Sequence, residues 1–243
     1  MDREFLKDHI REKVDFSQTD QRKGVPVPPV QKEVPDDAEL IDLPDPKKLE
    51  IDASLVEAIS KRESRRSFTN EELGLDELSF LLWSTQGIRK ELDSERAYRV
   101  VPSAGCRHAL ETYIAVFKVE GLKQAIYRYI PLKHKLIKVK EYEDMGEKIT
   151  RAARGQSFVG NCAATFIWTT IPYRMEWRYG EASYKVIAID VGHVCQNLYL
   201  ACEAIDSGTC AIAAYDQDLM DSLLEVNGED EFTIYLAPVG KIG

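Results

Sequence analysis

One segment, residues 184–205 (YKVIAIDVGHVCQNLYLACEAI), limits the folds open to this chain more than any other. Ile187, Val191, Val194 and Leu198 recur at spacings of four and three, which is the period of an α-helix, and the remaining faces are also largely apolar. A helix that is apolar on nearly all sides must be covered on nearly all sides. A single domain of this size gives that cover with difficulty, so we expect a buried central helix and a homodimer.

The segments around this helix predict a mixed fold. Aromatic and β-branched runs at 112–119, 125–130, 135–139, 164–171, 209–214 and 232–240 read as strands, whereas 75–88 and much of 141–161 read as helices. Helices and strands alternate without a regular βαβ rhythm. The sequence therefore predicts an α+β fold rather than a doubly wound one.

Residues 1–51 and 52–243 are expected to differ in organisation. A short amphipathic helix is predicted over residues 2–16, and most of the ten prolines fall in the segment 23–48. Proline favours extended backbone, so this segment predicts a strap across the main domain or across a partner subunit. The compact domain begins near Asp52. Ser54 and Glu57 form a capping box for a helix expected to turn Leu55, Val56 and Ile59 inward.

Charge and ligand spacing exclude several classes of function. The formal net charge is −9, and no basic stripe is evident, so a nucleic-acid partner is not expected. The five cysteines and four histidines lack the spacing of a metal site or a disulfide framework. No apolar run is long enough for a membrane span, and a cytoplasmic location is expected. Residues 89–99 are expected to form a charged loop.

A local excess of arginine at 62–68 (RESRRSF) stands out in this acidic chain. If the backbone extends after the first helix of the domain, Arg62, Ser64 and Arg66 alternate toward one side. Guanidinium groups bind phosphate through paired, charge-assisted hydrogen bonds. The pattern predicts an anion site, although a solvated basic helix end, favoured by the helix dipole, explains the same residues.

Four motifs together resemble the FMN-dependent nitroreductase family, in the SagB-type dehydrogenase branch. RESRRSF is similar to the family's R-x-S-x-R opening, and VPSAGCRHALE (101–111) is similar to the branch's second flavin loop. The long stretch WRYGEASYKVIAIDVGHVCQNLYLACEAIDSGTCAIAAYDQD resembles its central helix, glycine turn and strand, and YLAPVGK resembles its C-terminal end. The resemblance spans about residues 52–243 in family order.

The resemblance implies noncovalently bound FMN. Arg62 and Ser64 then contact the phosphate and ribityl chain, with Lys241 as a further phosphate ligand. Arg66 lies near the N1/O2 edge of the flavin, where a positive charge stabilises the reduced form. Glu63, between them, contributes backbone.

The resemblance also implies a three-layer α/β/α sandwich with a central, mostly antiparallel sheet and the flavin at the dimer interface. The remaining cofactor contacts come from two segments. The loop Pro102, Ser103, Ala104 and Gly105 packs on the ring from the other subunit, and the segment with Ile212, Ala213 and Ala214 passes the opposite face. An amide near Ala213 points at flavin N5.

The expected function is an FMN-dependent oxidoreductase that moves electrons by a ping-pong sequence from a donor such as NAD(P)H to a small organic acceptor. Residues 172–183 are expected to form a lid over a shared pocket. Two alternatives stay open. One is a dehydrogenase of azoline heterocycles in peptides, for which Lys185 is a candidate base although Val186 replaces the tyrosine of those relatives. The other is a flavin-binding protein without turnover.

Overall fold

The structure is a computed structural model that describes residues 3–92 and 96–243. Residues 93–95 of the charged loop expected at 89–99, and residue 2 of the expected N-terminal helix, lie outside the described residues. The described ends of that loop are instead two strands, β2 (Ile88–Glu91) and β3 (Ala97–Arg99), which pair antiparallel in a small second sheet. A seven-stranded sheet runs through the centre in the order β1-β6-β5-β4-β7-β9-β8. All its described strand pairs are antiparallel. The strands are β1 (Leu40–Asp42), β4 (Leu110–Val116), β5 (Ala125–Ile130), β6 (Lys135–Lys140), β7 (Ala164–Thr170), β8 (Ser207–Thr209) and β9 (Phe232–Lys241).

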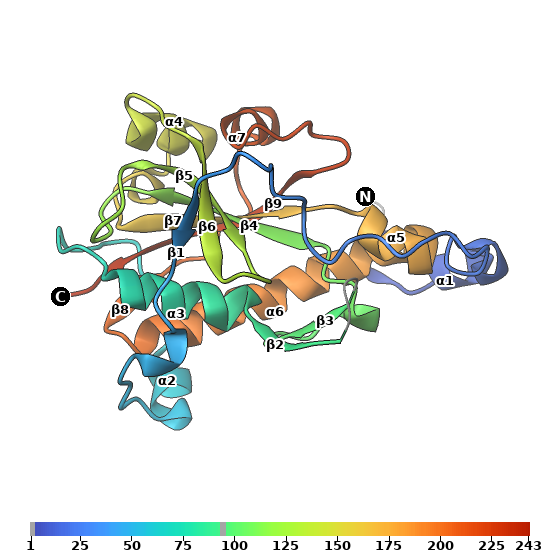
Figure 1. Ribbon diagram of the computed structural model, residues 1–243, viewed down its shortest axis with the longest axis horizontal. Helices are drawn as coiled ribbons and strands as arrows, with labels where there is room; N and C mark the ends of the chain where they lie inside the picture. Colours follow the sequence, from blue (N-terminus) through green and yellow to red (C-terminus); the bar gives the residue numbers. More distant parts are fainter. Residues whose placement is uncertain (1–2, 93–95) are drawn as a thin grey trace.

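Helices cover the sheet on both faces, as Figure 1 shows. On one face lie α3 (Leu75–Gln86) and α6 (Ser183–Glu203); on the other lie α4 (Met145–Ala152) and α7 (Gln217–Leu223). Two apolar cores fill the spaces between these layers. The predicted α+β class, and its arrangement as a three-layer α/β/α sandwich around an antiparallel sheet, are confirmed.

Burial on both faces explains the composition of the central strands. Every residue of β4, β5 and β7 is buried, so these strands read as nearly continuous apolar and aromatic runs instead of alternating patterns. Their predicted positions are correct to within a few residues. The segment 209–214 is different: β8 ends at Thr209, and a single bridge between Ile212 and Leu236 continues the pairing.

The helix signals at 54–87 are confirmed at atomic detail. The Ser54 hydroxyl accepts a hydrogen bond from the Glu57 backbone N–H at 3.2 Å, and the Glu57 carboxylate accepts from the Ser54 backbone N–H at 3.3 Å. This capping box starts α2 (Leu55–Lys61). Gly87 ends α3, as its position after the last helical residue predicts.

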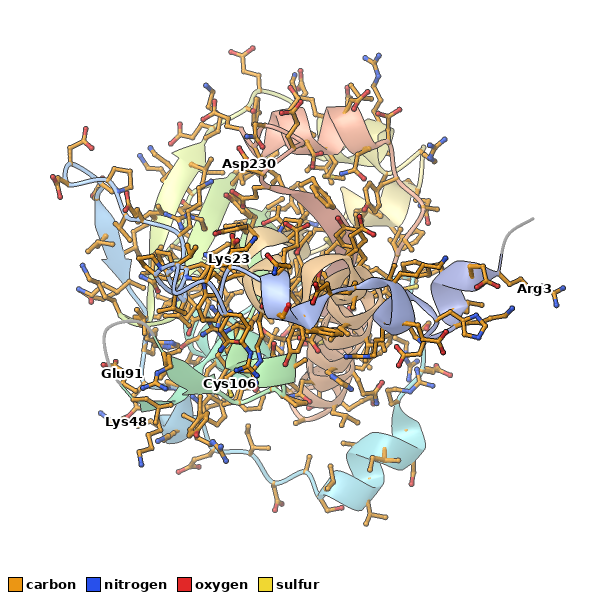
Figure 2. The ribbon with its side chains drawn as sticks, turned by 90° about the vertical axis from the view of Figure 1, so that its right-hand side faces the viewer. Arg3, Lys23, Lys48, Glu91, Cys106 and Asp230 are labelled. Carbon is orange, nitrogen blue, oxygen red and sulfur yellow. The ribbon has the colours of Figure 1, made fainter. Side chains whose placement is uncertain are left out.

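The inward face predicted for α2 is wrong. Leu55, Val56 and Ile59 are 67%, 74% and 58% exposed, and Ala58 is the buried residue of the helix. Figure 2 shows α2 at the lower edge of the molecule. The capping box determines where a helix starts, but no element among the described residues covers the apolar face of α2. An exposed apolar face of this kind marks an interaction surface.

Two further local predictions need correction. The helix expected over residues 2–16 is replaced by a single 3₁₀ turn (Glu4–Leu6) and a four-residue helix, α1 (Ile10–Lys13). The lid expected at 172–183 begins with a true helix, α5 (Tyr173–Tyr179), whose Arg174, Met175 and Trp177 are buried. A stretch that packs three side chains inward is part of the scaffold.

The proline-rich strap lies on its own chain. The Trp177 indole N–H donates to the Val25 carbonyl at 2.9 Å, and β1 of the strap pairs with β6. The boundary expected at residue 51 stays a prediction. Strand β1, from residues 1–51, pairs with β6 at the edge of the sheet that residues 52–243 form, so the two parts share one sheet.

Buried charges hold the middle of the strap. The Arg99 guanidinium donates to the Val30 carbonyl at 2.6 Å, and the Arg128 guanidinium donates to the Lys32 and Glu33 carbonyls at 3.1 and 2.6 Å. The Lys32 backbone N–H donates to the Glu111 carboxylate at 2.7 Å. The partners of these buried charges are backbone groups of the strap. The strap therefore supplies the hydrogen bonds that water would otherwise make to charged side chains buried in the domain.

Candidate functional site

The arginine motif meets the central helix at Tyr199. The Arg62 guanidinium carbon lies 5.2 Å from the centroid of the Tyr199 ring. The Ser64 and Tyr199 hydroxyl oxygens are 2.9 Å apart, and the Ala211 backbone N–H donates to the Tyr199 hydroxyl at 2.8 Å. One side chain of α6 therefore ties together the two segments predicted to lie on the cofactor.

The backbone at 62–66 is extended, as the alternating pattern requires. Ser64 forms an isolated parallel bridge with Thr209, and the Arg65 N–H donates to the Thr209 carbonyl at 2.9 Å. Arg62 and Ser64 both face Tyr199, whereas the alternate residues Glu63 and Arg65 form a 2.7 Å ion pair with each other. The predicted alternation is confirmed for these four positions.

Close packing against Gly208 holds the extended segment 62–66 in position. A Cβ added to Gly208 would lie 2.5 Å from the Cγ atom of Arg65, so only glycine lets the two segments approach this closely. Arg66 is exposed, and among the described residues its side chain has no hydrogen bond or ion pair. The cluster thus offers one guanidinium stacked on an aromatic ring and one guanidinium free to bind an anion.

Lys241 is near this region but is engaged elsewhere. Its ammonium group forms a short ion pair with Glu77 and donates to the Ile205 carbonyl at 2.9 Å. Glu77 also accepts the Gly74 backbone N–H at the start of α3. Lys241 therefore links the end of β9 to α3, and this arrangement does not bring it into contact with Arg62 or Arg66.

The backbone that follows β8 is partly open. Ile212 is buried and exchanges two hydrogen bonds with Leu236. Ala213 and Ala214 are exposed, and the Ala214 carbonyl accepts a hydrogen bond from the Gln156 side chain at 2.9 Å. Within the described residues, the Ala213 N–H has no acceptor, so it is available to a ligand.

The second predicted loop packs against another part of α6. Residues Ala104–Cys106 form a 3₁₀ turn in which Gly105 has φ +59°, a conformation that favours glycine. Burial raises the pKa of the nearby Asp190 carboxyl above its usual value, although hydrogen bonds with Ser103 and the Ala104 backbone oppose the shift. Pro102 and Ser103 help line a cavity of about 390 Å³ beside this loop.

The two halves of the predicted site are separate within one chain. Tyr199 and Asp190 are nine residues apart on α6, which is about 13–14 Å along the helix axis. Between them, Gly192, His193 and Gln196 form an exposed stripe on the helix. Lys185 lies farther toward the N-terminus of α6, where its ammonium group donates to the Leu6 carbonyl at 2.8 Å.

Sequence reasoning missed two residues that organise the site. Tyr199 and Asp190 lie in the apolar helix α6. The one sequence signal that could have found them is a polar group within a helix that is otherwise largely apolar. A hydroxyl or carboxyl in such a helix needs a partner from another segment, and that partner is not visible in the sequence. Among the described residues, no group of three or more histidine, cysteine, aspartate or glutamate side chains is placed to hold a metal ion.

Two curated proteins are similar to this chain in sequence. A curated protein of Methanocaldococcus jannaschii, named "Putative nitroreductase MJ1384", is 30% identical over 201 residues, which is 83% of this chain and 96% of that protein. The trifolitoxin-processing protein TfxB of Rhizobium leguminosarum bv. trifolii is 26% identical over 169 residues, or 64% of this chain. The match spans 44% of TfxB.

Solved structures share the fold. A nitroreductase-like protein from Anabaena variabilis aligns with a TM-score of 0.65 at 27% identity, over 78% of this chain and 38% of its own length. One from Ralstonia eutropha aligns with a TM-score of 0.70 at 24% identity, over 90% and 99%. A chain of the E. coli microcin synthetase McbBCD complex aligns with a TM-score of 0.62 at 16% identity, over 100% and 95%.

The sandwich fold and these likenesses define the class of protein, an oxidoreductase of the nitroreductase type. The family model described as "Nitroreductase family" matches residues 59–241. The chain belongs to the nitroreductase family. Across the described residues, no helix is both long and apolar enough to cross a bilayer.

Proposed function

We propose that this protein is an FMN-dependent oxidoreductase that takes electrons from a donor such as NAD(P)H and passes them to a small organic acceptor. The observation that carries the proposal is the convergence of Arg62, Ser64 and the 211–214 segment around Tyr199. Family membership gives the class of reaction, and this cluster gives the residues that would bind the cofactor.

The residues present fit FMN. Arg62 and Ser64 would hold the phosphate and ribityl chain, and Tyr199 would keep both side chains in position. Arg66, exposed and without a described partner, would supply positive charge at the N1/O2 edge. The unpaired N–H of Ala213 would donate toward the ring, with Ile212 and Ala214 beside it. When bound, FMN supplies hydride chemistry that no side chain of the chain can provide.

The remaining contacts are proposed to come from a second copy of the chain. The loop Pro102, Ser103, Ala104 and Gly105 sits too far along α6 to reach the Arg62 cluster of its own chain, so it would complete the partner's site in a homodimer. Two exposed surfaces support this assembly. One is the apolar face of α2, and the other is the stripe on α6 together with the neighbouring Ile189, which is 48% exposed. Glu63 would contribute only backbone to the site.

The lysines receive narrower roles. Lys241 would contact the phosphate only after exchanging its ion pair with Glu77, so we propose that it positions β9 and contributes long-range positive charge. Lys185 is held by the Leu6 carbonyl at the N-terminal end of α6. We propose no catalytic step for it in the leading function.

A second function is favoured by the likeness to TfxB, which is named as a processing protein for trifolitoxin. In this alternative, the chain belongs to the SagB-type branch and dehydrogenates azoline heterocycles in a peptide, with Lys185 as the base. Val186 beside it lacks a phenol, so the lysine would act alone.

Anaerobic titration of the purified protein separates these functions. We expect a visible flavin absorption band that is lost when NADH or NADPH is added and that returns when an acceptor such as a nitroaromatic is supplied. Initial rates at several acceptor concentrations should give parallel double-reciprocal lines. Donor-free loss of two hydrogens from a peptide azoline would support the alternative, and a flavin band that no donor removes would indicate binding without turnover. Protein that takes up no flavin from excess FMN would contradict the proposal.

A further inference from the structure

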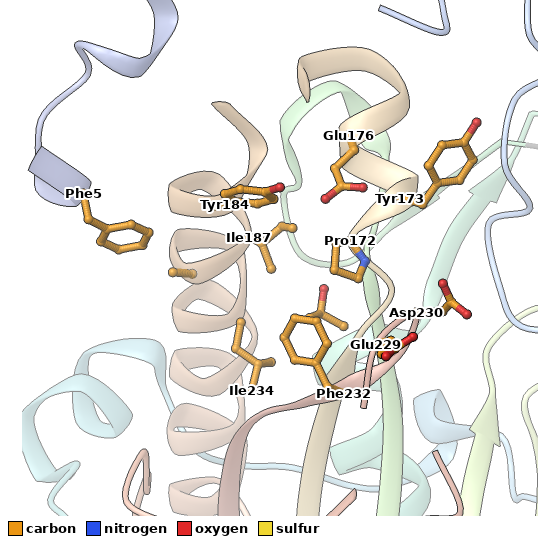
Figure 3. A pocket seen from close by; sticks show the side chains of 12 residues that line it. Phe5, Pro172, Tyr173, Glu176, Tyr184, Ile187, Glu229, Asp230, Phe232 and Ile234 are labelled. Atoms are coloured by element: carbon orange, nitrogen blue, oxygen red, sulfur yellow. The ribbon is translucent and has the colours of Figure 1, made fainter. Parts of the chain in front are cut away.

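A second cavity lies at the opposite end of α6 from the Arg62 cluster. It has a volume of about 480 Å³ and opens where β7 ends, α5 and α6 begin, and β9 starts, as Figure 3 shows. Tyr184 in its lining is 15 residues from Tyr199 on the same helix, or about 22 Å along the axis. The function proposed above assigns nothing to this cavity.

The walls of the cavity are mainly apolar and aromatic. Ile187, Phe232 and Ile234 form one side, and the ring of Tyr184 faces the same space. Thr170 also lines the cavity; it is 1% exposed, and its hydroxyl oxygen has no hydrogen-bond partner among the described residues. A buried hydroxyl without a partner carries a free-energy cost that a bound donor would remove.

Three carboxylates line the same cavity: Glu176, Glu229 and Asp230. No lysine, arginine or histidine side chain is in the lining, and the described residues form no salt bridge to any of the three. Glu176 and Tyr184 lie side by side at the upper edge and share a hydrogen bond. Negative charge thus surrounds an apolar interior.

We propose that this cavity binds an organic cation, an ammonium group carried on an aromatic or aliphatic body. The carboxylates would neutralise the charge, and the faces of Tyr184 and Phe232 would attract it through cation–π contacts. The Thr170 hydroxyl would accept a hydrogen bond from the ammonium N–H. The apolar body would fill the space against Ile187 and Ile234. The inference goes beyond the proposed function, because it requires neither a flavin nor a second subunit.

Three probes with the same aromatic body test the charge preference. Isothermal titration calorimetry on the full chain would compare 2-phenylethylamine, 2-phenylethanol and phenylacetate, which carry a positive, a neutral and a negative group. We expect the amine to bind at a single saturable site and the alcohol to bind about tenfold more weakly. Phenylacetate should show no saturable binding. Equal affinities for the amine and the alcohol, or no saturable binding of the amine, would overturn the proposal.

Variants locate the binding. Glu176→Gln, which keeps the hydrogen bond with Tyr184, should weaken amine binding about three- to tenfold while leaving the alcohol unchanged. Phe232→Leu should weaken the amine more than the alcohol, because it removes a ring but keeps an apolar wall. Glu71→Gln removes an exposed carboxylate outside the cavity and should change neither affinity. Circular dichroism checks the fold of each variant. If Glu176→Gln and Phe232→Leu both bind the amine like the parent protein, the site is elsewhere and the proposal fails.

Discussion

Replacing Glu111 by glutamine should destabilise the protein more than any surface charge change. Glu111 is 1% exposed, and its carboxylate accepts hydrogen bonds from the Arg174 guanidinium at 2.6 Å and from the Lys32 backbone N–H at 2.7 Å. A guanidinium nitrogen of Arg128 lies 3.7 Å from the other carboxylate oxygen. The substitution Glu111→Gln keeps the size and one acceptor oxygen but removes the charge that balances these arginines.

The size of the effect follows from burial. Arg99, Arg128 and Arg174 are 4%, 3% and 3% exposed, so water cannot replace the lost carboxylate. Removing one member of a buried ion pair costs about 3–5 kcal/mol. Because glutamine retains an acceptor, we expect the lower end, about 3 kcal/mol in the free energy of unfolding. The strap should also loosen, since the Lys32 backbone N–H would then donate to a neutral amide oxygen in place of a carboxylate.

Urea unfolding at a fixed protein concentration measures this cost. A matched control is Glu225→Gln, which breaks the 2.7 Å ion pair with Lys140 between side chains that are 47% and 48% exposed. The control should cost less than about 1 kcal/mol. A Glu111→Gln loss no larger than that of the control would refute the reasoning that buried arginines depend on this carboxylate.

Three further predictions concern pH, the site and assembly. Burial alone would raise the pKa of Glu111, but the nearby arginine charges outweigh burial and hold the pKa below its usual value. The stabilising effect of the Glu111 carboxylate is therefore complete above about pH 4.5 and is lost as the pH falls through the folded-state pKa. Thermal unfolding should therefore show the parent protein and Glu111→Gln converging in acid; a constant difference would contradict this. Tyr199→Phe leaves the Ala211 N–H without its acceptor and should weaken FMN binding about fivefold or more in fluorescence titrations, and an unchanged affinity would remove Tyr199 from the site. The double variant Leu55→Glu, Val56→Glu should be monomeric in analytical ultracentrifugation yet folded by circular dichroism, whereas an intact dimer would show that α2 lies outside the interface.

Signals carried by neighbouring residues could be predicted from the sequence. Ser54, Glu57 and Gly87 act within one or two helical turns, so their effect on helix ends is visible without the fold. The apolar period of α6 is similarly local, and its bounds were predicted to within two residues. The mixture of elements predicted the α+β class, whereas the antiparallel sandwich was implied only by the family resemblance.

Features that depend on distant partners could not be predicted. The outward face of α2 was read as inward, because apolarity alone does not say whether a core or another molecule covers a helix. Glu111 and Arg174 are 63 residues apart, and Arg99 and Val30 are 69 apart, so neither pairing leaves a mark in the local sequence. The stretch holding Arg174 and Trp177 was read as a lid for the same reason: its polar and aromatic residues pack inward against partners elsewhere.

The measurement that tests the central claim most directly compares FMN with riboflavin, which lacks the phosphate, on the parent protein and single arginine variants. Loss of one hydrogen bond to a charged group costs about 1.5–3 kcal/mol. Arg62→Ala should therefore weaken FMN binding by about tenfold or more while leaving riboflavin affinity nearly unchanged. Arg66→Ala, at the ring edge, should weaken both ligands alike, and Arg65→Ala, on the opposite side of the strand in an ion pair with Glu63, should change neither. If Arg62→Ala shifts FMN and riboflavin equally, or shifts neither, the arginine motif does not bind the phosphate and the account is contradicted.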